Sequence, residues 1–115
     1  MTEINAITLA VTDMARSLRF YRDALGLDVD FGGDDAEFTT LRFGSNFINL
    51  FVADGPIRFW GRAILHVDDP DEVWRRLLEC GVSPEGEPAD APWGERYFHV
   101  RDPDGHELSF ARRLH

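Results

Sequence analysis

The feature that most constrains this chain is an internal repeat. The segment Ile7–Asp13 is followed by a helical pattern and Leu25–Leu27, and about 56 residues later Ala63–Asp69 is followed by a second helical pattern and Cys80–Val82. Two units too small to fold alone must pack together to bury their apolar faces, and the seam between them is a natural place for a cleft. The sequence therefore predicts a duplicated fold with a ligand groove between its halves.

Length, charge and cysteine content narrow the class of protein. The chain has 115 residues, which suits one domain, and a net charge of −9, which argues against nucleic acid as a partner. No apolar run reaches the roughly 18 residues of a membrane span, and no charged-then-apolar leader is present, so no membrane association is expected. The single cysteine, Cys80, cannot form an intramolecular disulfide. We expect a small buried side chain there and a reducing, cytoplasmic location.

The first half reads as a strand, a helix and three further strands. Asp13 is a suitable N-cap for a helix over residues 14–24, and Gly26 is a suitable stop. Alternation of apolar and polar residues, interrupted by glycine pairs and Gly-Ser, predicts strands over residues 4–11, 28–31, 37–43 and 46–53.

The second half repeats this order with one interruption. Asp69 and Pro70 predict the start of a helix that runs to Glu79, after a strand over residues 62–67. A Pro/Gly-rich loop over 83–94 interrupts the repeat, and the pattern of the second strand is only weakly present in it. Two strands, 95–101 and 106–112, follow and are joined by a turn over 102–105.

Strand parity separates two faces. One face is uniformly apolar and is expected to pack beneath the helices; its residues are Ile7, Leu9, Val11, Ile48, Leu50, Val52, Ala63, Leu65, Val67, Leu108 and Phe110. The other face mixes aromatic, small and ionisable residues and contains no lysine, which is typical of a pocket lining. The alternative is a second core or a dimer contact in which Arg62 pairs with Glu107.

Three motifs carry a family resemblance. Val11–Ser17, Phe20–Leu27 and Arg101–Leu108, together with the doubled unit, resemble the vicinal oxygen chelate superfamily, which includes glyoxalase I, extradiol dioxygenases, fosfomycin-resistance enzymes and bleomycin-resistance proteins. The resemblance implies an α+β fold of two βαβββ modules that form an incomplete barrel, paired in a homodimer. Module 1 would cover about 1–53, a linker about 54–60 and module 2 about 61–115 of a single domain. The segment Pro92–Phe98 looks most like the antibiotic-binding branch.

The same resemblance implies where a metal would bind. Enzymes of the superfamily hold a divalent cation through inward His, Gln or Glu residues on the first and fourth strands of each module. Those positions here carry Ala6, Asn49, Arg62 and Ser109. Alanine has no donor atom, and a guanidinium repels a cation. We therefore expect no metal and no other cofactor.

Other chemistries stay open as alternatives. A displaced metal site would draw on His66 and His99, with Glu107, Glu37 or Glu95 nearby. Metal-free catalysis would use His66 with Glu107 as acid and base, or Ser109 as a nucleophile beside a histidine. A lyase, isomerase or dioxygenase of the superfamily is thus the main alternative. A purely structural dimerisation module is a third.

The leading interpretation is a metal-independent protein that binds a small aromatic or antibiotic-like molecule in the groove between the modules. Arg42, Arg62 and His66 favour a carboxylate or phenolate over a cationic drug. The residues expected to contact the ligand are the polar Asn49, Arg62, His66, His99, Glu107 and Ser109 and the aromatic Phe38, Phe47, Phe51, Trp60, Trp93 and Tyr97.

Overall fold

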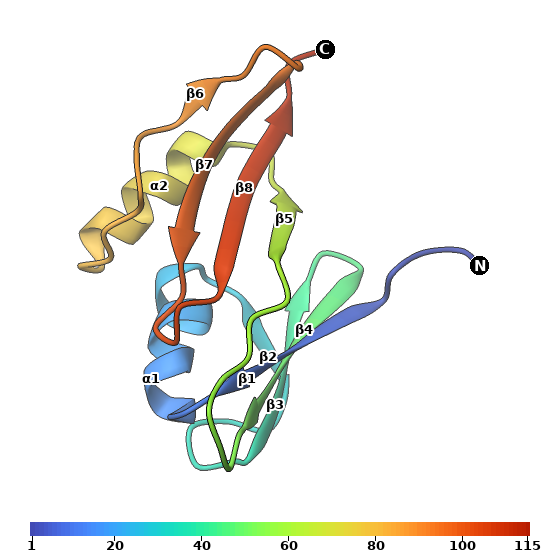
Figure 1. Cartoon of the computed structure of the whole chain (residues 1–115), viewed down its shortest axis with the longest axis vertical. Helices are drawn as coiled ribbons and strands as arrows, with labels where there is room; N and C mark the ends of the chain where they lie inside the picture. The colour runs from blue at the N-terminus through green and yellow to red at the C-terminus, as the bar shows by residue number, and fades with distance from the viewer. The chain divides into compact units, whose positions relative to one another are not determined.

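The structure is a computed structural model that describes residues 1–115. The chain divides into two compact units, Met1–Phe59 and Trp60–His115. Each unit contains one open four-stranded sheet of mixed direction and its own helical segment (Figure 1). The order of elements is strand, helix and three strands in both units, which confirms the predicted α+β class with two βαβββ modules.

Unit 1 is built around a sheet with the strand order β1-β4-β3-β2. Its elements are β1 (Ala6–Val11), α1 (Met14–Leu18), a π-helical turn η1 (Arg19–Ala24), β2 (Asp28–Phe31), β3 (Phe38–Phe43) and β4 (Asn46–Val52). The first strand runs parallel to the last, with Ala6 opposite Phe47, and the remaining neighbours are antiparallel.

The core of unit 1 lies between this sheet and the helical segment. Leu9 and Leu50 on the sheet and Leu18 and Tyr21 on the helical segment are each no more than 2 % exposed. Burial of such side chains contributes about 1.5–3 kcal/mol each relative to exposure. The alternate residues of β1 and β4 that were predicted to be apolar therefore form the face that packs against the helical segment.

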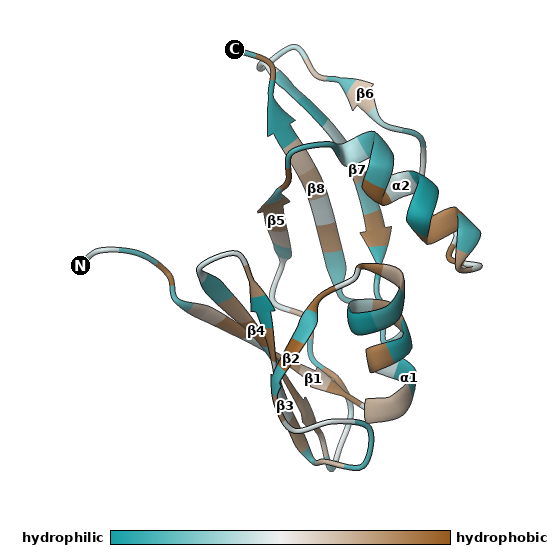
Figure 2. Ribbon diagram, turned by 180° about the vertical axis from the view of Figure 1, so that it is seen from behind, coloured by the Kyte–Doolittle hydropathy of each residue, from teal (hydrophilic) through white to brown (hydrophobic).

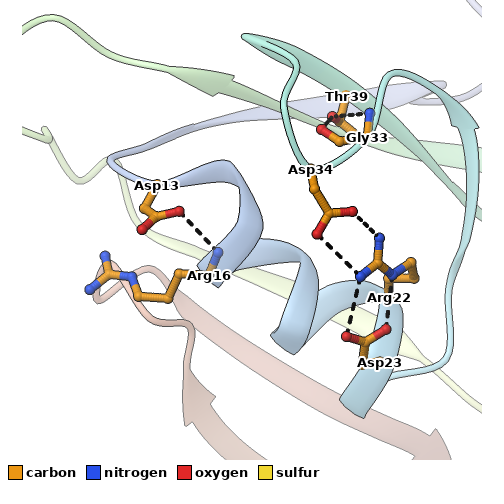
Figure 3. A network of polar contacts seen from close by, with 7 residues as sticks. All are labelled: Asp13, Arg16, Arg22, Asp23, Gly33, Asp34 and Thr39. Carbon is orange, nitrogen blue, oxygen red and sulfur yellow. Dashed lines mark hydrogen bonds and ion pairs between the residues drawn. The ribbon is translucent and has the colours of Figure 1, made fainter.

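Polar contacts fix both ends of the helical segment (Figure 3). Asp13 is the N-cap, and its carboxylate accepts a hydrogen bond from the backbone N–H of Arg16 at 3.1 Å. At the other end Arg22 bonds Asp23 at 2.8 Å and Asp34, in the loop before β3, at 2.6 Å. These bonds to the guanidinium lower the pKa of both carboxyl groups.

Unit 2 has the matching sheet order β5-β8-β7-β6. Its elements are β5 (Arg62–His66), α2 (Pro70–Glu79), β6 (Ala89–Asp90), β7 (Glu95–Arg101) and β8 (Glu107–Arg113). Here too the first strand is parallel to the last, and β7 is antiparallel to both of its neighbours. Hydrophobic and hydrophilic residues alternate along β8 (Figure 2), so the two faces of this sheet differ in polarity.

One face of the second sheet packs against α2. Leu77 of α2 is fully buried, and Phe98, Val100, Leu108 and Phe110 of the sheet are no more than 2 % exposed. Asp69 caps α2 by accepting the backbone N–H groups of the first turn, as predicted. An ion pair ties the helix to β7, with 2.7 Å between Arg96 Nε and Asp71 Oδ1, and this bond lowers the pKa of Asp71.

Several local expectations need correction. The helix predicted over residues 14–24 is α-helical only to Leu18, and its wider second half has a hydrogen bond of 2.9 Å from Leu25 N–H to the Phe20 carbonyl. Apolar spacing and caps specify where a helix starts and stops, not how tightly it winds. Cys80 is exposed rather than buried, because it lies at the C-cap of α2, beyond the last packed turn. The expectation for the loop over 83–94 needs no correction, because its equivalent of the second strand is only the two-residue β6. No helix is long and apolar enough to span a lipid bilayer.

Candidate functional site

The candidate site is the face of the second sheet that points away from α2. Because Arg96 bonds Asp71 of α2, the side chains of β7 with the opposite parity lie on the other face. The pairing of β5, β8 and β7 puts their matching residues on the same face. We call this surface the open face; its residues are Arg62, Ile64, His66, Glu95, Tyr97, His99, Arg101, Glu107, Ser109 and Ala111.

A three-residue bridge crosses the middle strand of the open face. Arg62 Nη1 lies 3.1 Å from His99 Nε2, and His99 Nδ1 lies 2.6 Å from Ser109 Oγ. A guanidinium has only donors, so Nε2 must accept and the ring proton must be on Nδ1. Nδ1–H therefore donates to Ser109 Oγ. In this tautomer His99 cannot remove the serine proton, so the geometry does not support Ser109 as a nucleophile.

The surroundings of His99 favour its neutral form. Burial lowers the pKa of His99, and the nearby Arg62 charge lowers it further, while Glu85 and Glu107 act in the opposite direction. A neutral ring is the form that can accept from Arg62. The lowered pKa and the bonding pattern therefore agree.

This lowered pKa predicts that acidification destabilises the fold through His99. The unfolded chain binds the proton more readily, so the contribution is fully present above the ordinary histidine pKa of about 6.5 and is lost as the pH falls from there toward the folded-state pKa. NMR titration of the His99 ring should give a value below about 6.5. Arg62→Gln should raise it, because one of its causes is removed. A His99 pKa at or above the ordinary value would contradict this tautomer assignment.

Charged residues alternate in the row beside this bridge. Arg62 Nη2 lies 3.4 Å from Glu107 Oε2, which establishes the pairing that the sequence left open. Glu107 also lies 3.4 Å from Arg101, and Arg101 bonds Glu85 at 2.9 Å. Glu107 is thus shared between two arginines at long distance, and the Arg62 guanidinium keeps N–H groups that no protein atom uses.

The far end of the open face holds a second polar chain. His66 Nε2 lies 3.1 Å from Glu95 Oε2, and the indole N–H of Trp93 donates to Glu95 Oε1 at 2.9 Å. The bond from Trp93, followed by that from His66, lowers the pKa of Glu95. The ring of Trp93 lies 5.6 Å from that of Tyr97, and Tyr97 lies 5.0 Å from His99. The carboxylate partner of His66 is therefore Glu95. The acid–base alternative had assumed Glu107 in this role.

The predicted ligand-contacting residues divide between the units. The sheet of unit 1 carries Phe38, Phe47, Phe51 and Asn49 on one parity, with Asn49 hydrogen-bonded to Thr8 and Thr40. Arg42 bonds Asp30 at 2.7 Å and lies over the ring of Phe47. Unit 2 carries the other predicted residues, and Trp60 precedes β5 and is 60 % exposed.

Two residues of the open face, Glu95 and Ile64, were not among the ligand contacts expected from the sequence. Glu95 anchors both His66 and Trp93, and its position two residues before Tyr97 places it on this parity. Ile64 is 61 % exposed between Arg62 and His66. An isoleucine in a strand usually indicates a buried position, so only parity could have identified it.

The donor set does not fit the divalent metal that the resemblance implies. In unit 2 the two inherited positions are Arg62 and Ser109, and both are hydrogen-bonded to His99. The guanidinium offers no lone pair, and the Nε2 lone pair of His99 is directed at it. No group of three or more His, Cys, Asp or Glu side chains has an arrangement that could hold a metal ion.

Comparison with known proteins places the chain in a family. Residues 3–110 match the model of the Glyoxalase/Bleomycin resistance protein/Dioxygenase superfamily. The chain is 28 % identical to the uncharacterized protein YraH of Bacillus subtilis, covering 94 % of this chain and 96 % of that one. It is 31 % identical to Metapyrocatechase 2 of Cupriavidus necator over 89 % of this chain, but spans only 33 % of that protein.

A solved structure agrees with this comparison. A superfamily member from Sphaerobacter thermophilus is 25 % identical, with a TM-score of 0.79 and 98 % of both chains covered. The family match, the doubled βαβββ order and the parallel pairing of first and last strands all indicate one relationship. The chain belongs to the Glyoxalase/Bleomycin resistance protein/Dioxygenase superfamily.

Proposed function

We propose that this protein binds a small aromatic anion, a carboxylate or phenolate, on the open face without a metal ion. The observation that carries the proposal is Arg62. It stands at a position where the superfamily's enzymes carry a metal ligand, and it is held there by His99 and Glu107. A fixed guanidinium with unused N–H groups binds an anion where a metal ligand would bind a cation.

Apolar and aromatic groups beside Arg62 suit the rest of such a ligand. Ile64 is 61 % and Trp93 66 % exposed, and the ring of Tyr97 lies beside that of Trp93 at a tilt of 34°. Exposed apolar groups around a few polar groups are typical of small-molecule sites. Ser109 and Ala111 of the central strand are small and lie between the taller side chains of β5 and β7.

Binding of cinnamate tests this proposal by calorimetry, with the neutral cinnamamide as the matched probe. We expect cinnamate to bind more tightly, because only its carboxylate forms charged hydrogen bonds with Arg62. Arg62→Gln should weaken cinnamate binding roughly 10- to 100-fold and remove the preference over cinnamamide.

Arg75→Gln is the control for this test. It removes the same charge from α2, where Arg75 pairs with Glu72 of its own helix, so binding should not change. Equal binding of cinnamate and cinnamamide, or an equal loss in both variants, would contradict the role of Arg62. Stoichiometric metal in protein purified without chelator, lost with His66→Phe, would contradict metal independence.

The His66–Glu95 pair favours a second candidate function, proton transfer without a metal. The ionised Glu95 orients the ring through Nε2, and Nδ1, which makes no hydrogen bond within the chain, is available as a base in the neutral ring. Exchange of a substrate C–H proton with deuterium, measured by NMR and lost with His66→Phe, would support catalysis over binding alone.

A further inference from the structure

The open face offers opposite hydrogen-bonding groups at its two ends. At Arg62 the unused groups are all donors, because a guanidinium has no acceptor. At His66 the ionised Glu95 accepts Nε2–H, so a neutral ring keeps the Nδ1 lone pair, for which no protein atom is a partner. A ligand that satisfies both ends must accept at one end and donate at the other.

The spacing of the two ends follows from the strand that carries them. Arg62, Ile64 and His66 alternate along β5 on the same face. Four residues of extended strand separate their terminal Cα atoms by about 13 Å. Arg62 leans inward to His99, which lies level with Ile64, whereas His66 leans the other way to Glu95, beyond Tyr97, which lies level with His66. The ligand must therefore span a distance of this order. Its middle lies over Ile64, which is 61 % exposed, and beside the aromatic rings of β7.

We infer that the ligand is a hydroxyaryl carboxylic acid that lies along β5, with its carboxylate on Arg62 and its hydroxyl donating to His66 Nδ1. The inference rests on the proposed function and specifies the ligand class. An aromatic ring with a carboxylate arm and an opposite hydroxyl group has the required order of acceptor, apolar body and donor.

A neutral hydroxyl suits the His66 end better than an ammonium group. Glu95 already accepts from Trp93 Nε1 and from His66 Nε2, so its charge is bonded to two donors on the protein. The acceptor that makes no hydrogen bond within the chain is Nδ1 of the ring, in its neutral form. A single neutral hydrogen bond of this kind contributes about 0.5–1.5 kcal/mol net.

Calorimetry with 4-hydroxycinnamate, 2-hydroxycinnamate and cinnamate tests the inference. We expect 4-hydroxycinnamate to bind roughly three- to tenfold more tightly than cinnamate, and 2-hydroxycinnamate to gain nothing, because its hydroxyl lies near the carboxylate end. His66→Phe should remove the preference, so that 4-hydroxycinnamate and cinnamate bind alike. His66 is half exposed, so this variant should fold, and the ligand series on the unchanged protein does not depend on it.

Each outcome separates the two proposals. If cinnamate and 4-hydroxycinnamate bind equally and both need Arg62, the hydroxyl recognition is wrong and the anion site stands. If neither binds, the proposed function itself is wrong. Equal gain from the 2- and 4-hydroxyl groups, or tighter binding of 4-(aminomethyl)cinnamate, would overturn the assignment of a neutral donor to His66.

Discussion

Replacement of Phe110 by alanine is expected to lower the free energy of unfolding by about 3–5 kcal/mol. Phe110 is 2 % exposed on the β8 face that packs under α2, and its ring is stacked on Phe98 with 5.5 Å between centroids. Truncation removes this contact and leaves a cavity between sheet and helix that the neighbouring side chains cannot fill completely. Urea unfolding followed by circular dichroism measures the loss.

Phe110→Leu is the control for this effect. It keeps most of the buried volume and should cost less than about 1.5 kcal/mol. Ile64→Ala changes a side chain on the opposite face that is 61 % exposed, so it should cost still less. A loss below about 1 kcal/mol for Phe110→Ala would show that α2 does not seal this core.

The second large effect is expected at Gly32. Its φ is +91°, and a Cβ built there would lie 2.4 Å from the Phe38 carbonyl oxygen and 2.9 Å from Thr39 Cα. Backbone atoms of β3 cannot move aside without breaking its pairing with β4. Gly32→Ala therefore combines an unfavourable backbone conformation with a steric clash, and should cost about 2–4 kcal/mol. Thermal unfolding by calorimetry checks this.

Two other glycines separate these contributions. Gly44 has φ of +60° but open space around its Cα, so Gly44→Ala measures the conformational cost alone, about 1–2 kcal/mol. Gly55 has open space and no such backbone conformation, so Gly55→Ala should have almost no effect. If Gly32→Ala and Gly44→Ala cost the same, the close approach to β3 does not contribute.

Much of the fold follows from local patterns in the sequence. The Asp69-Pro70 cap, the helix end at Glu79 and strand 95–101 lie where predicted, and Gly105 N–H closes the predicted turn on the Asp102 carbonyl at 2.9 Å. Features that depend on tertiary contacts could not be predicted from these local patterns. The π-helical turn η1 depends on what the segment packs against, which spacing and turn residues do not record.

The sequence predicted which residues of the candidate site share a face of the sheet, but not which partners their side chains bond. Alternation along β5 and β8 places Arg62, His66 and Ser109 on one face. Which partner each side chain bonds depends on rotamers and on the strand register, so the choice of Glu95 for His66 came only with the structure. The homodimer and the groove between modules stay predictions, since they require contacts beyond a single unit.

The parallel pairing of the first and last strands has a kinetic consequence. Thr8 and Asn49, which are hydrogen-bonded across β1 and β4, are 41 residues apart, whereas His99 and Ser109 across the β7–β8 hairpin are 10 apart. Closing a long loop costs more chain entropy than closing a short one. The hairpins should therefore form early, and the rate of folding in each unit should be limited by the return of its opening strand to the edge of a sheet already half built.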